Sequence, residues 1–272
     1  MSIIAISRGT FSGGEALATR LAERLGYQCI SREMNLEAAA KEYAVPEAEL
    51  TAAMEKRPPF WHRVIGERTA HLAFVRATLC EQARAGDLVY HGLVGHLLLP
   101  GISHVIRVRV IADPELRAKT AMRERNLGEK EALAYIEKVD NERRQWIRFL
   151  FDVEWDDPHL YDAVLNLSRM SLATACETVA HLIERDEFKP TAESMKAMQN
   201  LALSSHVSAV LARDPRTKDA EVNVAAADGI VTVTGITRST AVEEAVPAVI
   251  RRVEGVKEVR SKIVFIPPYP IT

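Results

Sequence analysis

The chain of 272 residues contains only three cysteines, and they lie far apart in the sequence. The spacing of Cys29, Cys80 and Cys176 is not that of a metal site, so we expect reduced and mostly buried thiols. The longest apolar stretch, residues 93–99, is far shorter than the roughly 20 residues that a membrane-spanning helix needs. The N-terminus also lacks a basic segment followed by an apolar one. These absences predict a cytoplasmic protein with no signal peptide and no transmembrane segment.

A surplus of basic residues is also missing. Lysine and arginine number 35 against 37 aspartate and glutamate residues, and the formal net charge is −2. Because non-specific binding to nucleic acid requires a basic surface, we expect no nucleic-acid partner. The apolar share of 47% and the charged share of 26% are ordinary for a globular protein. The length allows one large domain or two domains of ordinary size.

The first predicted strand runs into a glycine-rich turn that lacks a lysine. Residues 2–8 form a short apolar run, and a helical pattern follows the turn. Gly9 and Gly14 have the G-x-x-x-x-G spacing of a P-loop, whose backbone N–H groups hold phosphate. A P-loop continues with Lys and Ser/Thr, whereas Glu15 and Ala16 follow here. The turn therefore has the backbone for phosphate without the usual cation or magnesium-binding hydroxyl, and a tight turn with no ligand is the alternative.

Strands and helices alternate up to about residue 186. Strands are expected at residues 2–8, 27–30, 88–92, 104–111 and 161–166. Helices are expected at residues 17–25, 61–84 and 171–184, with two charged helices within 115–149 that separate near 126–128. Residues 33–55 are helix-rich, and Pro46 is expected in the first turn of a new helix there. Pro58 and Pro59 interrupt the helical pattern, and Asp113 before Pro114 predicts a capped helix start. Such alternation predicts an α/β fold, a parallel sheet with helices on both faces.

The pattern changes after a polar stretch near residues 186–196. A helix, two strands, a second helix and a last strand follow, and Asp228-Gly229 between two alternating apolar runs is a strong hairpin signal. This order predicts a small α+β domain. We therefore expect a first domain at residues 1–186, a linker at 187–199, the small domain at 200–267 and a tail at 268–272.

Six arginines fall on the two charged helices: Arg117, Arg123, Arg125, Arg143, Arg144 and Arg148. Asp140 lies among them. Phosphoryl transfer needs cations aimed at the transferred group, and the planar fork of arginine matches phosphate oxygens. The alternative interpretation is a solvated helix face with local ion pairs, such as Glu137 with Arg144.

Two histidines flank a pair of glycines after the third strand. His91 and His96 have a spacing that admits a metal-ligand interpretation, but no third ligand is evident in the sequence. We therefore predict no metal site and favour a structural or substrate-orienting role. Trp61, Trp146 and Trp155 are expected to pack in the core or under a lid.

Several of these motifs together resemble cytidylate kinase-like proteins. The similar segments are Ile-Ser-Arg-Gly-Thr-Phe-Ser-Gly-Gly-Glu-Ala-Leu at 6–17, Arg-Val-Ile-Ala-Asp-Pro-Glu-Leu-Arg at 109–117, Lys-Val-Asp-Asn-Glu-Arg-Arg at 138–144 and Tyr-Asp-Ala-Val-Leu-Asn-Leu-Ser at 161–168. The resemblance covers about residues 2–185 and implies the P-loop fold of nucleoside monophosphate kinases. It also implies transfer of phosphate from ATP to CMP or dCMP, with Mg²⁺.

The resemblance implies two sets of site residues. The catalytic set on the arginine-bearing lid is Arg143, Arg144, Arg148 and Asp140, where Asp140 orients substrate or arginines. The nucleotide-binding set is Arg8, Gly9, Ser12, Gly13, Gly14, Arg117 and Arg123. Family members commonly have a cation where this chain has Glu15, and often an arginine in the stretch near Leu93. Loss of one such charge costs ~3–4 kcal/mol in the transition state, and we expect Arg8 to replace the lysine.

Residues 200–266 resemble a BON-type domain. The segment from Val222 to Gly235 fits the motif V-x-V-x-x-x-D-G-x-V-T-V-x-G. Members of that family are binding modules. The resemblance therefore implies a small ligand, a phospholipid or a protein as partner, or a second copy of this chain in a homo-oligomer, and it leaves these alternatives open.

Three functions follow from these observations. The first is an active nucleoside monophosphate kinase. The second is a catalytically impaired nucleotide-binding regulator whose BON-type domain binds a ligand or partner, and the third is an assembly module that no longer binds nucleotide. Glu15, Ala16 and Leu93 favour the second and third, whereas the glycine turn and the arginines favour the first and second.

Overall fold

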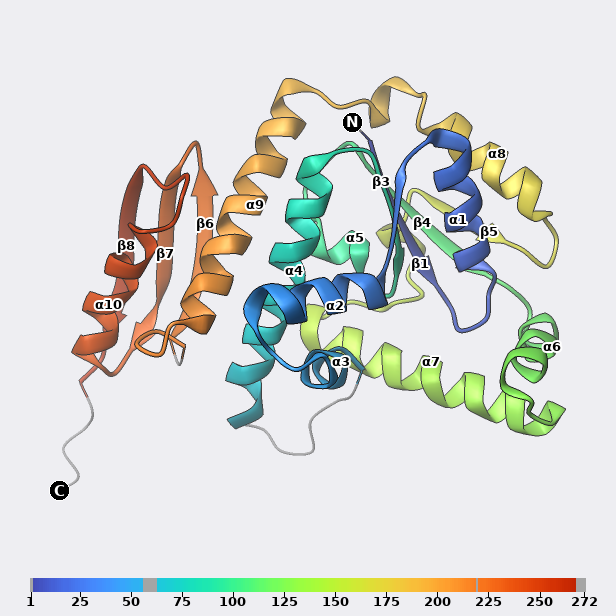
Figure 1. The fold of residues 1–272 in the computed structure, drawn as a ribbon, viewed down its shortest axis with the longest axis horizontal. Coiled ribbons are helices and arrows are strands. Elements are labelled where there is room, and N and C mark those ends of the chain that lie inside the picture. Colours follow the sequence, from blue (N-terminus) through green and yellow to red (C-terminus); the bar gives the residue numbers. More distant parts are fainter. Residues whose placement is uncertain (1, 56–62, 219, 268–272) are drawn as a thin grey trace. The chain divides into compact units, whose positions relative to one another are not determined.

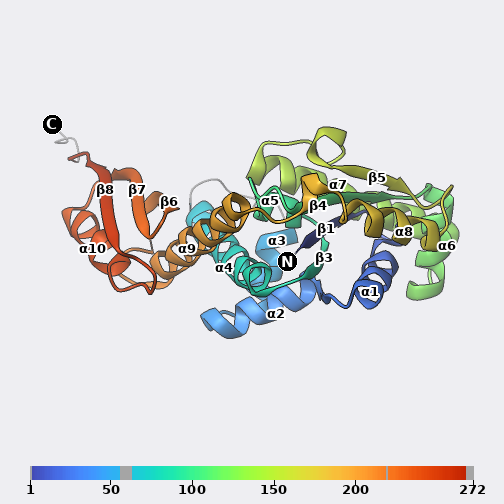
Figure 2. The same ribbon diagram turned by 90° about the horizontal axis from the view of Figure 1, so that it is seen from above.

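The structure is a computed structural model that describes residues 2–55, 63–218 and 220–267, with the backbone alone described at 55 and 63–69. Pro58, Pro59 and Trp61 lie outside these ranges. The chain divides into two compact units, which are considered separately (Figures 1 and 2). The first contains residues 2–35, 54–55 and 85–194, and the second contains residues 36–53, 63–84, 195–218 and 220–267.

The first unit is built on a parallel five-stranded sheet of order β2-β3-β1-β4-β5. The strands are β1 (Ile3–Arg8), β2 (Gln28–Ser31), β3 (Leu88–Gly92), β4 (Val105–Ile111) and β5 (Ala163–Asn166). The central strand β1 pairs with β3 and β4, so that Ile6 lies beside His91 and Ser7 beside Arg109. Every predicted strand of this sheet is confirmed. The order places the end of β1, where the glycine turn begins, in the middle of the sheet edge.

Helices cover both faces of this sheet, as the α/β prediction requires (Figure 1). They are α1 (Gly14–Leu25), α5 (Gly95–Leu98), α6 (Pro114–Arg125), α7 (Glu129–Phe151) and α8 (Leu172–Leu182), with 3-10 turns η1 (Pro158–Leu160) and η2 (Asp186–Phe188). Ile4 and Ile6 pack with Leu17 and Val179 in the core beneath α1 and α8. Because side chains alternate along a strand, Ser7 points to the opposite face. The short helix α5, which was not predicted, contacts β1.

The start of α6 differs in one detail from the prediction. Asp113 occupies the N-cap position before Pro114, but its side chain makes no capping hydrogen bond. Its backbone N–H instead donates to Ser168 Oγ at 2.6 Å. The loop that follows β5 thus holds the start of α6, and proline at the first helical position lacks an N–H that would need a partner.

The second unit contains a three-stranded sheet and several helices. The elements are α2 (Arg32–Tyr43), which begins in the first unit, α3 (Glu47–Glu55), α4 (Arg63–Ala85), α9 (Ala192–Arg213), α10 (Thr240–Ile250), β6 (Glu221–Ala227), β7 (Ile230–Thr237) and β8 (Glu258–Phe265). Strands β6 and β7 are antiparallel, and β7 and β8 are parallel. Asp228 and Gly229 join β6 to β7 with φ angles of 56° and 86°, which confirms the predicted hairpin.

The predicted linker is partly helical. Helix α9 begins at Ala192, so residues 192–199 belong to a helix and not to an extended connection. Thr191 and Ser194 exchange hydrogen bonds at this helix start: Ser194 N–H donates to Thr191 Oγ1 at 3.1 Å, and Thr191 N–H donates to Ser194 Oγ at 2.9 Å. This is the reciprocal pattern that starts a helix. The domain boundaries at 186 and 200 stay a prediction.

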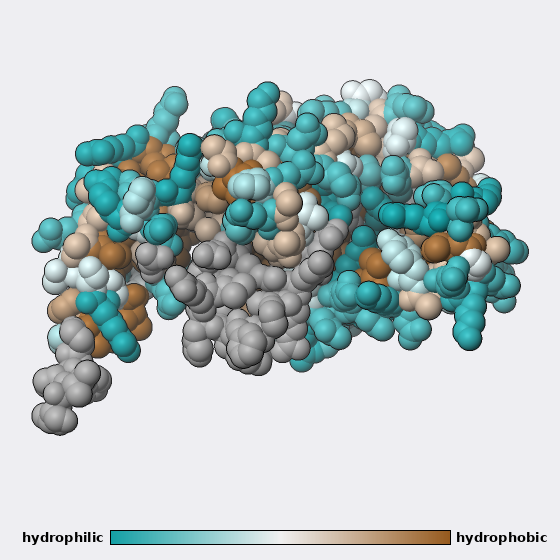
Figure 3. All heavy atoms as spheres, turned by 60° about the horizontal axis from the view of Figure 1, so that its bottom comes forward, coloured by the Kyte–Doolittle hydropathy of each residue, from teal (hydrophilic) through white to brown (hydrophobic). Residues whose placement is uncertain are grey.

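The surface and the thiols agree with a chain that buries its apolar residues. Cys80 and Cys176 are buried and Cys29 is half-buried, all without disulfides. On the face shown in Figure 3, hydrophobic residues lie in small groups among hydrophilic ones. Within the described ranges, every helix is too short or too polar to cross a membrane.

Candidate functional site

The glycine turn joins β1 to α1 and exposes the start of a helix. Phe11 and Gly13 adopt left-handed φ angles of 58° and 85°, and Ser12 N–H donates to Gly9 O at 3.2 Å. Gly13 occupies the N-cap of α1 and has no side chain to accept from the first-turn N–H groups. Free N–H groups and the helix dipole at such an N-terminus favour an anion.

Three buried polar atoms around the turn have no hydrogen-bond partner in the described part of the chain: Ser12 Oγ, Arg8 Nε and His91 Nδ1. Burial and the charge of Arg8 lower the pKa of His91, so this imidazole is neutral at pH 7. Buried polar groups nearly always form hydrogen bonds. The missing partners of these three atoms therefore indicate a place where a ligand with acceptor oxygens could bind. Gly9 and Gly14 close the same turn.

Arg8 lies against the start of α1 and pairs weakly with Glu15. The distance between Arg8 Nη2 and Glu15 Oε2 is 3.7 Å, and the Glu15 side chain is mostly exposed. A Cβ atom at Gly14 would lie only 2.6 Å from Arg8 Cβ. Gly14 is therefore needed so that the stem of Arg8 can pass beside the turn. The cation next to the glycine turn is therefore Arg8, which belongs to strand β1. In a P-loop the corresponding cation is a lysine at the start of the helix.

A first group of charges, the Thr10 cluster, consists of Thr10, Arg117, Asp140 and Arg143. Asp140 Oδ1 accepts from Thr10 N–H at 3.2 Å and from Thr10 Oγ1 at 2.7 Å. Arg117 of α6 donates through Nε to Thr10 O at 2.7 Å and pairs with Asp140 Oδ2. Arg143 of α7 donates to Thr10 Oγ1 at 2.8 Å. Asp140 is only 4% exposed. Two predicted arginines from different helices, Arg117 and Arg143, thus converge on the glycine turn.

A second group, the Asp156 cluster, consists of Arg109, Arg144 and Asp156. Arg109 Nη2 on β4 donates to Asp156 Oδ1 at 2.9 Å, and Arg144 Nε on α7 donates to Asp156 Oδ2 at 2.6 Å. Burial acts to raise the pKa of Asp156, but the hydrogen bond from Arg144 and the charge of Arg109 outweigh it and hold that pKa below its usual range. The carboxylate therefore remains ionised between its arginines at pH 7.

Ser7 connects the Asp156 cluster to the strand that leads into the glycine turn. Its hydroxyl oxygen accepts from Trp155 Nε1 at 2.9 Å and from Arg109 Nη1 at 3.3 Å. Tyr161 OH, at 3.4 Å from the same oxygen, donates to Trp155 O at 2.7 Å. The Arg109 guanidinium lies 3.8 Å over the Trp155 ring. This packing fixes the buried end of Arg109. Trp155 is itself buried, as the expected packing in the core or under a lid requires.

Two of the predicted site arginines on α6 and α7 lie outside both clusters. Arg123, near the end of α6, is exposed, and its Nε lies 3.4 Å from Lys119 O. Arg148 is exposed on α7 and pairs with Asp152 at 3.7 Å and with Glu154. The structure therefore brings Arg117 and Arg143 to the turn and Arg144 to Asp156, whereas Arg123 and Arg148 join neither cluster.

His96 is buried beneath the site. Both of its ring nitrogens lack a hydrogen-bond partner among the described residues, and its ring centroid lies 4.8 Å from that of Tyr161. Burial, with the charges of Arg109 and Arg107, lowers the pKa of His96 to about 3. His91 is the penultimate residue of β3, an internal strand, and His96 lies on α5. Nothing in the described ranges groups three metal-ligating side chains around either histidine.

The sequence analysis missed four contributors: Ser7, Thr10, Arg109 and Asp156. Arg109 carried a signal, because it is a charged residue in a strand whose neighbours in the sheet are buried. Thr10 and Asp156 carried none, since each acts through a contact with residues distant in the chain.

The residues at the turn do not form a magnesium site of their own. Ala16 offers no hydroxyl at the position where a P-loop binds Mg²⁺ through Ser or Thr. In the described chain, no three acidic, histidine or cysteine side chains gather around a common point. The glycine turn, with its unmet donors, does fit the phosphates of ATP.

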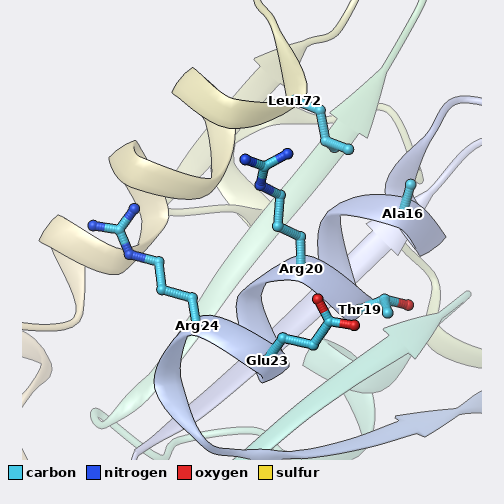
Figure 4. Close-up of a pocket in the computed structure, with 6 residues that line it drawn as sticks. All are labelled: Ala16, Thr19, Arg20, Glu23, Arg24 and Leu172. Carbon is cyan, nitrogen blue, oxygen red and sulfur yellow. The ribbon is translucent and has the colours of Figure 1, made fainter.

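An open groove of about 660 Å³ lies between α1 and α8 (Figure 4). Arg20 and Arg24 extend from α1 toward α8 there, and Ala16 and Leu172 lie at one end. Its arginines are exposed and belong to neither cluster. We therefore keep this groove separate from the candidate site.

Comparison with known proteins gives two family matches. Residues 3–169 match the cytidylate kinase-like family, and residues 200–267 match the BON domain. The first match spans more than half of the chain, so this protein belongs to the cytidylate kinase-like family. Both resemblances seen in the sequence are confirmed, and the protein is nucleotide kinase-like.

Three known proteins illustrate what this chain is similar to. A cytidylate kinase of Ignicoccus hospitalis is 27% identical over 185 residues, which are 67% of this chain and 99% of that protein. The crystal structure of an uncharacterized protein from Eubacterium ventriosum has a TM-score of 0.55 at 21% identity, over 68% of this chain and 100% of that one. A shikimate kinase of Bacteroides thetaiotaomicron has a TM-score of 0.44 at 10% identity, over 68% of this chain and 99% of that one. The Eubacterium structure shares the fold of the first unit.

Proposed function

We propose that the first unit binds ATP at the glycine turn and transfers its terminal phosphoryl group to CMP, dCMP or a similar nucleoside monophosphate. The Thr10 cluster carries this proposal, because arginines from both lid helices converge on the turn. The N–H groups at Gly13 and Gly14 face the phosphates. Phosphoryl transfer depends mainly on positioning and on cations around the transferred group, and this arrangement supplies both.

The proposed roles follow from the contacts. Arg8 takes the place of the lysine beside the turn, and Arg117 and Arg143 approach the transferred phosphoryl group from the lid. Asp140 orients these two arginines, since it contacts both. An acceptor oxygen forms a bond to the terminal phosphorus of ATP while the bond to the bridging oxygen breaks, and ADP leaves with that electron pair.

A second candidate, a nucleotide-binding regulator with little turnover, is favoured by one observation. Glu15 stands where a P-loop has lysine, and it pairs with Arg8 at 3.7 Å. The Glu15 carboxylate neutralises part of the positive charge of Arg8, and a bound phosphate would need that charge. In this candidate, the BON domain passes the nucleotide state to a small ligand, a phospholipid or a protein partner.

Calorimetric titration of the full chain with ATP and with CMP, both with Mg²⁺, tests the proposal. A coupled assay of ADP release then follows turnover. Binding of both nucleotides with ADP release supports the kinase. Binding without ADP release selects the regulator, and a failure to bind either nucleotide contradicts both candidates.

A further inference from the structure

We propose that Arg109 and Arg144 form the subsite for the phosphate of the acceptor, and that Asp156 occupies this subsite until such an acceptor binds. The inference rests on the proposed kinase function and names its acceptor class. That class is a phosphate monoester, such as a nucleoside monophosphate, as opposed to an acceptor recognised through hydroxyl groups alone.

The geometry around Asp156 is that of an anion held between two guanidinium groups. Each carboxylate oxygen accepts from a different arginine, at 2.9 Å from Arg109 Nη2 and at 2.6 Å from Arg144 Nε. Neighbouring phosphate oxygens bind arginine forks in the same manner. The two arginines carry two positive charges, and the Asp156 carboxylate neutralises only one of them. A phosphate dianion would neutralise both. Asp156 therefore acts as an internal substitute for the phosphate.

The subsite is both open and firmly built. The Asp156 and Arg144 side chains are 51% and 42% exposed, so a dissolved anion can reach them. Arg109 is buried, and its guanidinium carbon lies 3.8 Å from the centroid of the Trp155 ring. Within the described residues its Nε has no acceptor. A phosphate has more oxygens than a carboxylate to meet the donors of such a fixed fork.

The subsite also lies beside the place proposed for the ATP phosphates. Arg143 and Arg144 are consecutive on α7, and the first contacts Thr10 while the second contacts Asp156. Burial lowers the pKa of Arg109, and the charges of Asp156 and Asp140 act in the opposite direction. Asp140 of the Thr10 cluster is therefore within electrostatic range of Arg109. Transfer between two phosphates requires that their sites adjoin in this way.

Substitution of Asp156 by asparagine tests the inference. Asn keeps the size of the side chain but removes the charge that competes with phosphate. We expect the D156N variant to bind CMP roughly tenfold more tightly than wild type in calorimetry, the scale of one charge-assisted hydrogen bond. Cytidine, which lacks the phosphate, and ATP should bind as they do to wild type. Glu154→Gln is the matched control, because it removes the same charge nearby from a residue that pairs with exposed Arg148.

Arg144→Ala provides the complementary test on a half-exposed residue of α7. It should weaken CMP binding roughly tenfold and leave ATP binding unchanged. The inference is overturned if D156N leaves CMP affinity unchanged or lowers it while ATP still binds. A wild-type chain that does not bind ATP would instead overturn the proposed function. The two failures are thus distinguishable by the ATP titration.

Discussion

Asp140 accepts two hydrogen bonds from Thr10, at 3.2 Å from its backbone N–H and at 2.7 Å from its hydroxyl. Thr10 belongs to the glycine turn and Asp140 to helix α7, so these bonds fasten α7 to the turn. Asp140 also pairs with Arg117 and lies 3.9 Å from Arg143. One buried carboxylate therefore organises the cations proposed to contact ATP.

Replacement of Asp140 by alanine should destabilise the protein. The substitution removes a buried counter-ion from two partly buried arginines, and the expected loss of unfolding free energy is roughly 2–3 kcal/mol. Urea denaturation at pH 7 measures this loss. Glu142→Ala is the control, since Glu142 is exposed on the same helix, α7, and its effect should stay within about 0.5 kcal/mol. Equal effects of the two variants would contradict the role of Asp140.

Replacement of Glu15 by lysine should raise the affinity for ATP. Lysine restores the cation of a P-loop and frees Arg8 from its partner at 3.7 Å. We expect the Glu15→Lys variant to bind ATP roughly 5- to 10-fold more tightly than wild type in calorimetry, and the Glu15→Gln variant to show a smaller gain in affinity. Glu23→Lys, on the exposed side of the same helix, controls for net charge. Unchanged or weaker ATP binding in the Glu15→Lys variant would argue against phosphate at this turn.

Replacement of Gly14 by alanine should disturb the turn through Arg8. The new Cβ would lie 2.6 Å from Arg8 Cβ and 3.2 Å from Arg8 Cδ. Overpacking of this kind costs about 1–3 kcal/mol, and displacement of Arg8 should also weaken ATP binding. Gly86→Ala is the control, because an added Cβ there meets no atom within 4 Å. The prediction is contradicted if thermal and urea unfolding of both variants match wild type.

Stability should fall as the pH is lowered below 6.5, in part because of His96. Its pKa is about 3 in the folded protein and 6.5 ordinarily, so the unfolded chain binds its proton first. Arg109, Arg107 and Asp162 face it, and the depressed pKa follows from burial and the two arginines. The linkage predicts no loss above pH 6.5, a loss of about 2 kcal/mol by pH 5, and a further loss down to about pH 3.

Comparison of the wild type with a His96→Leu variant isolates this contribution. Urea denaturation at pH 7 and pH 5 should show a smaller pH dependence for the variant. The contributions of the carboxylates with lowered pKa values, such as Asp156, are lost only at lower pH. An identical pH dependence in the two proteins would show that His96 is not buried as described.

The sequence predicted the elements better than the contacts between them. β1, the glycine turn and α1 are adjacent in the chain, and local periodicity defines all three. The bonds of Thr10 to Asp140 join residues 130 positions apart, which no local pattern encodes. Asp156 lies in an irregular segment between α7 and η1, where no periodicity applies.

The helix that connects to the BON domain began earlier than predicted for a similar reason. Its start depends on the reciprocal bonds of Thr191 and Ser194, and serine replaces the Glu or Gln that usually marks this pattern. Lys189-Pro190 before it has the composition of a linker. The composition of this stretch therefore predicted an extended linker. In the structure, the side-chain hydrogen bonds of Thr191 and Ser194 start a helix there.

Hydrogen–deuterium exchange of the full chain, with and without ATP and Mg²⁺, most directly tests whether nucleotide binds at the glycine turn. Bound phosphates should slow exchange of the backbone N–H groups in residues 9–16, and closure of the arginines should slow it in residues 137–144. Arg117→Ala should reduce both effects. Unchanged exchange in residues 9–16 at saturating ATP, or protection confined to other parts of the chain, would contradict nucleotide binding at this turn.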